Sequence, residues 1–259
     1  MVNLFDSHTH LDDERLICDI DQIVGDFEAD GLDFIIDASA DFATMQKAFE
    51  LSQKYDKIFA TIGCHPNDAL TFDQKMADLM AEYAKNPKVV AVGEIGLDYH
   101  YDEPSKEVQH KAFVEQLDLA NSFGLPVQLH IRDAYGDALQ VLKDNRSLLK
   151  NGVLLHCYSG SKEMAQEFLK FDAFFSFGGA ITFKNAKKEE IIQSIPVEKL
   201  LTETDAPYMT PHPFRGKTNY PKLIKYTYLK MAEVLGLSFD ELEHQIKKNT
   251  FALFKRTNI

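Results

Sequence analysis

Two histidines stand one residue apart near the start of the sequence, in the stretch FDSHTHLD. A short apolar run precedes them, and in an extended strand every second side chain points to the same face. His8 and His10 would therefore direct both imidazoles to one point, which is how two ligands reach a single metal ion. The alternative is a polar strand end with two solvated histidines, and this spacing alone does not decide between the two interpretations.

Further histidines and carboxylates follow other apolar runs of strand length. They offer nitrogen and oxygen donors without thiolate, a set that suits Zn²⁺, Mn²⁺, Fe²⁺, Ni²⁺ or Mg²⁺. One tetrahedral ion does not need so many donors, whereas a pair of divalent ions bridged by a carboxylate would use them all. The predicted metal ligands are His8, His10, Glu94, His130, His156 and Asp205.

Polar residues beside these ligands could take part in metal-assisted hydrolysis. His65 precedes a proline and could act on the substrate or only shape a turn, and Glu203 could orient a ligand as readily as do chemistry. Arg132 could offset negative charge on a phosphoryl group, and Asp205 could accept a proton from the attacking water. The predicted catalytic residues are Asp205, Glu94, His65, Arg132 and Glu203.

The elements that must position these residues are strands alternating with helices. Apolar runs that are mostly continuous, as in strands buried on both faces, occupy residues 2–5, 34–38, 58–62, 89–92, 127–131, 153–155, 173–177 and 200–202. Apolar residues at helical spacing lie between them, and Gly31 and Gly124 stand before strands, where a helix end needs a left-handed residue.

This alternation predicts an α/β fold with a parallel sheet. Eight strand–helix units in 259 residues predict a (β/α)₈ TIM barrel of the metal-dependent hydrolase type, since about 250 residues is typical of that barrel. An open doubly wound sheet is the alternative, but no Gly-rich phosphate loop follows the first strand. No linker or repeat indicates a second domain, so we expect one domain over residues 1–259.

Composition restricts the class of protein. The net charge of −12 argues against a protein that coats nucleic acid generally, without excluding a local basic patch. Cys18, Cys64 and Cys157 are too few and too scattered for a disulfide framework. No apolar stretch approaches the roughly 20 residues that span a bilayer, and no signal peptide precedes the first strand. We therefore expect a cytoplasmic protein with no membrane contact and no obligate protein partner.

Eight motifs occur in an order that is specific as a set: FDSHTHLD, IGCHPN, VGEIGLDYHYD, PVQLHIRDA, LHCYSG, SFGGAITFK, TETDAPY and KNTFALF. The chain thereby resembles the TatD-like metal-dependent deoxyribonucleases, a branch of the amidohydrolase-type barrels. The resemblance implies that His8, His10 and Asp205 hold one divalent ion and that His130 and His156 hold another. It also implies that Glu94 bridges the two ions, that His65 lies beside the scissile group, and that DNA is hydrolysed in the 3′–5′ direction.

The chain departs from the family pattern after TDAPY, where the family commonly reads like PHRGKRNEP. Phe214, Thr218 and Tyr220 replace the usual His, Arg and Glu, whereas Arg215 and Lys217 remain. The departure leaves the metal site intact and puts the identity of the substrate in doubt.

Cations on the loops after the last two strands predict where a substrate binds. Lys184, Arg215 and Lys217 are the predicted substrate-binding residues, and a single-stranded DNA end fits a narrow barrel mouth better than a duplex. The same metal site could instead serve a small ester, lactone, amide or phosphate monoester. In other barrels of the superfamily that this chain resembles, a modified Lys after the fourth strand often bridges the two metal ions. Glu94 follows the fourth predicted strand here, which favours the nuclease branch. A non-catalytic binding protein is the third possibility, against which the full ligand set argues.

Overall fold

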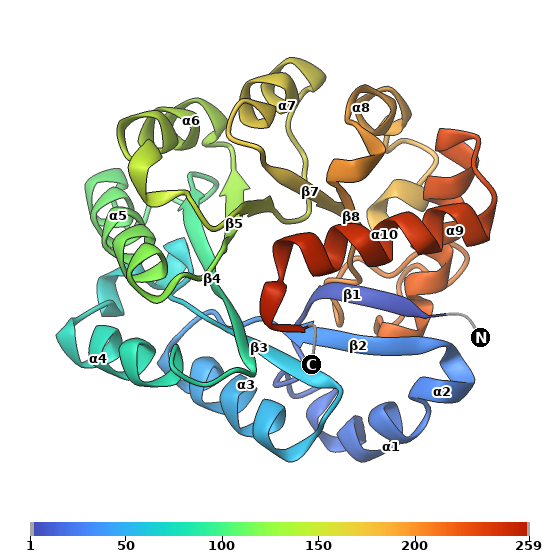
Figure 1. The fold of residues 1–259 in the computed structure, drawn as a ribbon, viewed down its shortest axis with the longest axis horizontal. Coiled ribbons are helices and arrows are strands. Elements are labelled where there is room, and N and C mark those ends of the chain that lie inside the picture. The colour runs from blue at the N-terminus through green and yellow to red at the C-terminus, as the bar shows by residue number, and fades with distance from the viewer. Residues whose placement is uncertain (1–2, 258–259) are drawn as a thin grey trace.

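A computed structural model describes residues 3–257, and these form a nearly closed barrel of eight parallel strands alternating with helices (Figure 1). The strands pair in chain order, β1 to β8, so the predicted (β/α)₈ fold is confirmed and the doubly wound alternative is wrong. The strands are β1 (Leu4–Thr9), β2 (Leu32–Asp37), β3 (Ile58–Ile62), β4 (Val89–Asp98), β5 (Val127–Arg132), β6 (Val153–Leu155), β7 (Phe174–Phe177) and β8 (Leu200–Thr202).

Helices surround the strands on their outer side (Figure 1). They are α1 (Ile20–Gly25), α2 (Phe27–Asp30), α3 (Phe42–Lys54), α4 (Gln74–Tyr83), α5 (Lys106–Phe123), α6 (Tyr135–Asp144), α7 (Lys162–Leu169), α8 (Glu189–Ser194), α9 (Ile224–Leu235) and α10 (Phe239–Leu253), and the short 3₁₀ helices include η2 (Pro66–Thr71), η4 (Gly179–Thr182) and η7 (Lys255–Thr257). Local sequence sets several of their ends. Asp41 begins α3 by accepting the N–H of Thr44 at 2.8 Å, and Gly31 and Gly124 end α2 and α5 with φ of 74° and 66°. None of the helices within residues 3–257 has the length and apolarity to cross a bilayer.

The strand boundaries agree with the sequence where the apolar run is continuous, as in β3, β6 and β8. The predicted first strand, residues 2–5, begins at a residue outside the described part of the chain. Its end is wrong, because β1 continues through His8 to Thr9 with every residue buried. The first predicted metal ligand therefore projects from within a strand.

The largest difference is in β4, which continues six residues beyond the predicted strand, residues 89–92. Gly93 and Gly96 interrupt the apolar run, so the sequence pattern did not predict that the strand continues past residue 92. A Cβ on Gly93 would lie 2.6 Å from the Cβ of Gln128, and one on Gly96, where φ is 141°, would lie 2.1 Å from the carbonyl oxygen of His130. The glycines thus allow β4 to pack closely on β5 and keep Glu94 inside the strand.

The contact between β8 and β1 differs from the others. Along the described chain the ladder joins β1 to β8 in order, without strand pairing from β8 back to β1. Two backbone hydrogen bonds, from Asp205 to the carbonyl of His8 at 3.0 Å and from His10 to that of Ala206 at 2.7 Å, and several side chains hold this seam. Asp6 accepts the N–H and the hydroxyl of Thr204 at 2.9 and 2.5 Å, Ser7 donates to the carbonyl of Thr202 at 3.0 Å, and Thr202 donates to the carbonyl of Phe5 at 3.2 Å.

The C-terminal segment covers the end of the barrel where the strands begin. Helix α10 packs against β1 and β8 (Figure 1), and the ring of its Phe251 packs on Phe5 and Phe34. In η7, the Arg256 guanidinium donates to carbonyls at the entry to β4, including that of Val89 at 2.9 Å. The opposite end, where the strands finish, stays open for a functional site, as in barrel enzymes generally.

Candidate metal centre

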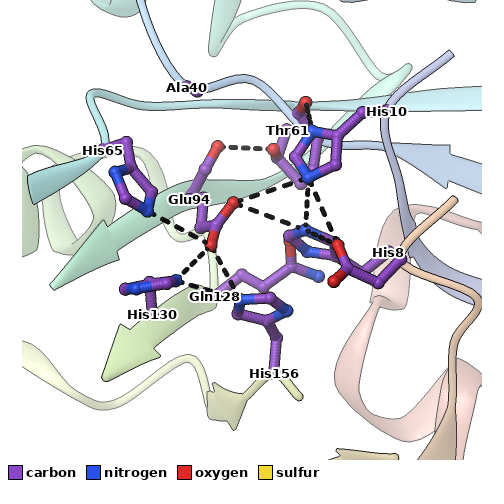
Figure 2. Close-up of polar contacts among 12 residues, drawn as sticks. His8, His10, Ala40, Thr61, His65, Glu94, Gln128, His130 and His156 are labelled. Atoms are coloured by element: carbon purple, nitrogen blue, oxygen red, sulfur yellow. Dashed lines mark hydrogen bonds and ion pairs between the residues drawn. The ribbon is translucent and has the colours of Figure 1, made fainter. Parts of the chain in front are cut away.

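Five imidazoles surround one carboxylate at the open end of the barrel. Figure 2 shows the rings of His8, His10, His65, His130 and His156 arranged around Glu94. Groups of three His, Asp or Glu donors lie within 4.8 Å of one another here, and together they include all six predicted ligands. The structure thus brings together residues from both ends of the sequence, because parallel strands end at the same rim.

The hydrogen bonds of His8 and His10 fix the direction of their lone pairs. Gln128 donates to the carbonyl of Ser7 at 2.7 Å, which turns its Oε1 toward Nδ1 of His8 at 2.8 Å. Nδ1 of His10 lies 3.0 Å from the carbonyl oxygen of Ala38. Both Nδ1 atoms must donate, so both Nε2 atoms present lone pairs in the neutral rings, and these two nitrogens are 3.1 Å apart. Two lone pairs at this distance repel unless a proton or a metal ion lies between them, so the neutral pair fits a metal ion.

Each imidazole of the second pair faces an outer carboxylate. Nε2 of His130 lies 3.0 Å from Asp98, and Nδ1 of His156 lies 3.6 Å from the buried Oε1 of Glu203. The opposite nitrogens, Nδ1 of His130 and Nε2 of His156, each lie 2.7 Å from Oε1 of Glu94 and 3.4 Å from each other. Outer carboxylates that orient ligand histidines are typical of metal sites.

Glu94 faces both pairs of histidines, one with each oxygen. Its Oε1 points to His130 and His156, while its Oε2 lies 3.4 Å from Nε2 of His8 and 3.8 Å from that of His10. Asp205 adds an oxygen 3.5 Å from Nε2 of His10 and 3.8 Å from that of His8. The donors therefore fit two divalent ions with a bridging carboxylate.

The charges of the centre are strongly coupled. Burial alone would raise the pKa of Glu94, but the neighbouring imidazoles hold that pKa well below its usual range. Burial alone would lower the pKa of His10, but the hydrogen bond to Asp205 and the charge of Glu94 outweigh it and raise the pKa to about 9. Without an ion, protonated imidazoles thus compensate the carboxylates.

Metal affinity should consequently rise with pH. Below about pH 9, the proton on His10 must leave before its Nε2 can bind an ion. For each proton displaced in this way, the metal affinity increases about tenfold when the pH rises by one unit. Titration calorimetry with Mn²⁺ between pH 6 and 8.5, in buffers of different ionisation enthalpy, measures both the affinity and the protons released. An affinity that stays constant over this range, with no proton release, would contradict the assignment of His10 as a ligand.

His65 lies beside the centre with a defined proton position. Its Nδ1 accepts the backbone N–H of Asn67 at 3.1 Å, so Nε2 carries the proton in the neutral ring. Burial lowers the pKa of His65 to about 3, and Nε2 lies 3.7 Å from Glu94. At neutral pH this side chain is therefore an uncharged donor at the floor of the cleft.

The other predicted residues divide between two cavities. Arg132 is exposed and lines the metal cleft, whose volume is about 730 Å³. Lys184 and Arg215 line a separate cavity of about 410 Å³ on the loops after β7 and β8, where the Arg215 guanidinium lies 4.5 Å from the ring centre of Phe183. Lys217 is exposed on the same loop as Arg215. None of the three cations predicted to bind substrate lines the metal cleft in residues 3–257, whereas Arg132, predicted as catalytic, does.

Sequence reasoning missed two residues that orient ligands, Gln128 and Asp98. Both are buried polar residues on strands that already carry a ligand, two residues before His130 and four residues after Glu94. An even spacing along a strand places side chains on the same face. A search for polar residues two or four positions from each ligand would have found them. Glu203, predicted as catalytic, is fully buried and accepts the hydroxyl of Ser176 at 2.5 Å.

The chain is similar to a set of known proteins over nearly its whole length. The family model described as TatD related DNase matches residues 5–255. An uncharacterized metal-dependent hydrolase, YabD, from Bacillus subtilis is 40% identical over 97% of this chain and 99% of its own. A 3'-5' ssDNA/RNA exonuclease, TatD, from Klebsiella pneumoniae is 31% identical over 97% of both chains.

Solved structures agree with this relationship. The crystal structure of the TatD homologue YjjV from Escherichia coli has a TM-score of 0.91 and 30% identity, covering 97% of this chain and 98% of that one. The motifs, the barrel and the clustered donors therefore lead to the same conclusion. The chain belongs to the TatD-related DNase family and is a metal-dependent hydrolase.

Proposed function

We propose that the protein hydrolyses phosphodiester bonds in DNA, releasing nucleotides stepwise in the 3′–5′ direction from a single-stranded end. The observation that carries the proposal is Glu94, whose two oxygens face two separate pairs of imidazoles at the floor of an open cleft. Paired divalent ions suit the in-line displacement of a phosphodiester, because they act on both the attacking and the leaving oxygen. The name of the Klebsiella pneumoniae relative, a 3'-5' ssDNA/RNA exonuclease, supports the same substrate class.

The proposed ligands are His8, His10 and Asp205 for one ion and His130 and His156 for the other, with Glu94 between them. Two divalent ions would make water a nucleophile at neutral pH and offset the charge of the phosphoryl oxygens. Nitrogen and oxygen donors suit Mg²⁺, Mn²⁺, Zn²⁺ or Ni²⁺, and we propose that the two ions are among these.

The side chains of the cleft have distinct proposed roles. Asp205, whose pKa lies below its usual range because the hydrogen bond to His10 outweighs burial, accepts the proton of the attacking water. Nε2–H of His65 donates to a phosphoryl oxygen, and the free guanidinium of Arg132 pairs with the negative charge. Glu203 acts through His156, whose Nδ1–H it faces.

A second candidate function has one observation in its favour. Only Arg132 among the Lys and Arg residues of the described chain lines the metal cleft, whereas Lys184 and Arg215 line another cavity. A polyanion would gain more from cations beside the metals than this arrangement supplies. Hydrolysis of a small ester, lactone, amide or phosphate monoester is therefore the alternative.

Chelation and DNA form together test the proposal. We expect EDTA to abolish nucleotide release and Mn²⁺ or Mg²⁺ to restore it, because the donors are preset for divalent ions. End-labelled single strands should be shortened faster than blunt duplexes, and a closed circle should resist. Cleavage should weaken as salt rises, because phosphate contacts release counterions. The measurement is product length on a denaturing gel, at two salt concentrations.

Glu94→Gln protein purified in parallel is the control for contaminating nucleases. Cleavage of the circle as fast as the linear strand would exclude an exonuclease. Absence of cleavage on every DNA, with turnover of a p-nitrophenyl ester or phosphate, would establish the second candidate instead.

A further inference from the structure

Tyr208 is a large aromatic side chain exposed beside the metal ligands. It follows β8 three residues after Asp205, its exposed fraction is 46%, and its side chain lines the metal cleft. An aromatic ring left in water at the wall of an active-site cleft gains nothing from burial in the free protein. Its exposure indicates a surface that a substrate covers.

Neighbouring side chains hold this ring in one orientation. The Tyr208 hydroxyl donates to Oδ2 of Asp13 at 3.2 Å, and the Arg15 guanidinium lies 4.5 Å from the ring centre. Arg15 is itself fixed by two hydrogen bonds to Asp13, at 2.8 and 2.7 Å. Tyr208 lines the cleft whereas Arg15 does not in the described chain, so part of the half-exposed ring faces the cleft. A flat apolar face is thus held in place before any ligand binds.

The ring also lies next to the predicted metal ligands. Its centre is 5.9 Å from that of the His10 imidazole, and the two rings meet edge to face at 77°. A planar group that contacts the cleft-facing part of the Tyr208 ring would therefore lie beside His10 and the predicted metal site. In a nucleic acid, the planar groups next to a phosphate are the bases of the two nucleotides that it joins.

We infer that Tyr208 is the stacking surface for the base of the nucleotide whose phosphate lies at the metal centre. The inference rests on the proposed function and names the chemistry that selects the substrate, a phosphoester that carries a nucleobase. Every base has a face that can stack, so the site tolerates any sequence. A base inside a duplex is already stacked on its neighbours, so Tyr208 favours an unpaired end.

Binding of a nucleotide and of its base-free counterpart tests the inference directly. The probes are thymidine 5′-phosphate and deoxyribose 5-phosphate, titrated by calorimetry into the Mn²⁺-loaded protein. We expect the wild-type protein to bind the nucleotide about tenfold more tightly, which is the usual size of one base–aromatic stack. In Tyr208→Ala this preference should fall to about one, whereas Tyr208→Phe, which keeps the ring, should retain it.

A structural role for Tyr208 predicts a different result. If the ring only supports His10, Tyr208→Ala lowers the affinity for both phosphates and for Mn²⁺ by the same factor, and the preference ratio stays unchanged. Tyr208→Leu, which restores apolar bulk beside His10 without an aromatic face, separates the two roles. A retained preference in Tyr208→Leu or Tyr208→Ala, or a wild-type protein without any preference for the nucleotide, would overturn the inference.

Turnover of two diesters distinguishes this failure from failure of the proposed function. Thymidine 5′-p-nitrophenyl phosphate and methyl p-nitrophenyl phosphate share the same leaving group, and only the first carries a planar group besides it. We expect Tyr208→Ala to lower the ratio of their kcat/KM values about tenfold. If the wild-type protein hydrolyses neither diester while the binding preference depends on Tyr208, the proposed nuclease function fails and the stacking surface stands.

Discussion

Replacing Glu94 by glutamine should lower kcat by about 10³-fold or more and reduce the number of bound ions. Charge stabilisation by a metal ion is worth several kcal/mol, and each 1.4 kcal/mol corresponds to a factor of about ten in rate. Glutamine keeps the shape of the side chain but offers one oxygen instead of two, so it can no longer serve both pairs of histidines. The measurements are turnover, metal content by mass spectrometry and circular dichroism on the same preparation.

Asp98→Asn is the matched control, because Asp98 is also buried and its carboxylate lies 3.0 Å from Nε2 of His130, on the side of that ring away from Glu94. Loss of such an outer partner typically costs about 10–100-fold in metal affinity or activity. The barrel should stay folded in both variants, since Glu94 contributes little to the apolar core. Glu94→Gln protein with the wild-type turnover and the wild-type metal content would remove Glu94 from the centre.

Replacing Asp205 by asparagine should lower turnover by about 10²–10⁴-fold, the range for removing a group that accepts a proton in the transition state. An amide keeps an oxygen for the metal, but it cannot accept the proton of the attacking water. Metal content should therefore change less than it does in Glu94→Gln. Turnover of a nitrophenyl diester at saturating Mn²⁺ and metal content, both at pH 7, are the measurements.

Asp133→Asn controls for the removal of one negative charge from the rim, since Asp133 is exposed and lies beside His100 at 3.4 Å, outside the metal centre. Its turnover should match that of the wild-type protein. If Asp205→Asn also retains wild-type turnover at pH 7, another group accepts the proton and the proposed mechanism is wrong.

The barrel and the position of all six predicted metal donors at one rim could be predicted from the sequence for a simple physical reason. Strands buried on both faces are continuous apolar runs, and polar residues at their ends are conspicuous. The full length of β4 was not predicted, because Gly93 and Gly96 are typical of a loop in sequence. In the structure these glycines allow β4 to pack closely on β5. The extent of a strand that contains glycines depends on its neighbours, which a linear pattern does not contain.

Other features of the site depend on tertiary contacts that no spacing encodes. The carbonyl oxygen of Ala38 sets the tautomer of His10, and a backbone group has no sequence signature. Lys184 and Arg215 were expected near the metals because they follow β7 and β8, yet the course of their loops takes them to another cavity. Tyr208 was not singled out, since aromatic residues on loops usually pack inward.

The seam between β8 and β1 gives the predicted ions a second consequence. His8 and His10 lie on one side of this seam and Asp205 lies on the other, where its N–H donates to the carbonyl of His8 at 3.0 Å. An ion shared by these three residues would cross-link the first and last strands where the ladder is interrupted. Loss of that ion would leave β1 and β8 joined by two backbone hydrogen bonds and a few side-chain contacts, so local opening of the barrel would start there. Metal occupancy would then govern both the lifetime of the closed barrel and the chemistry at its rim.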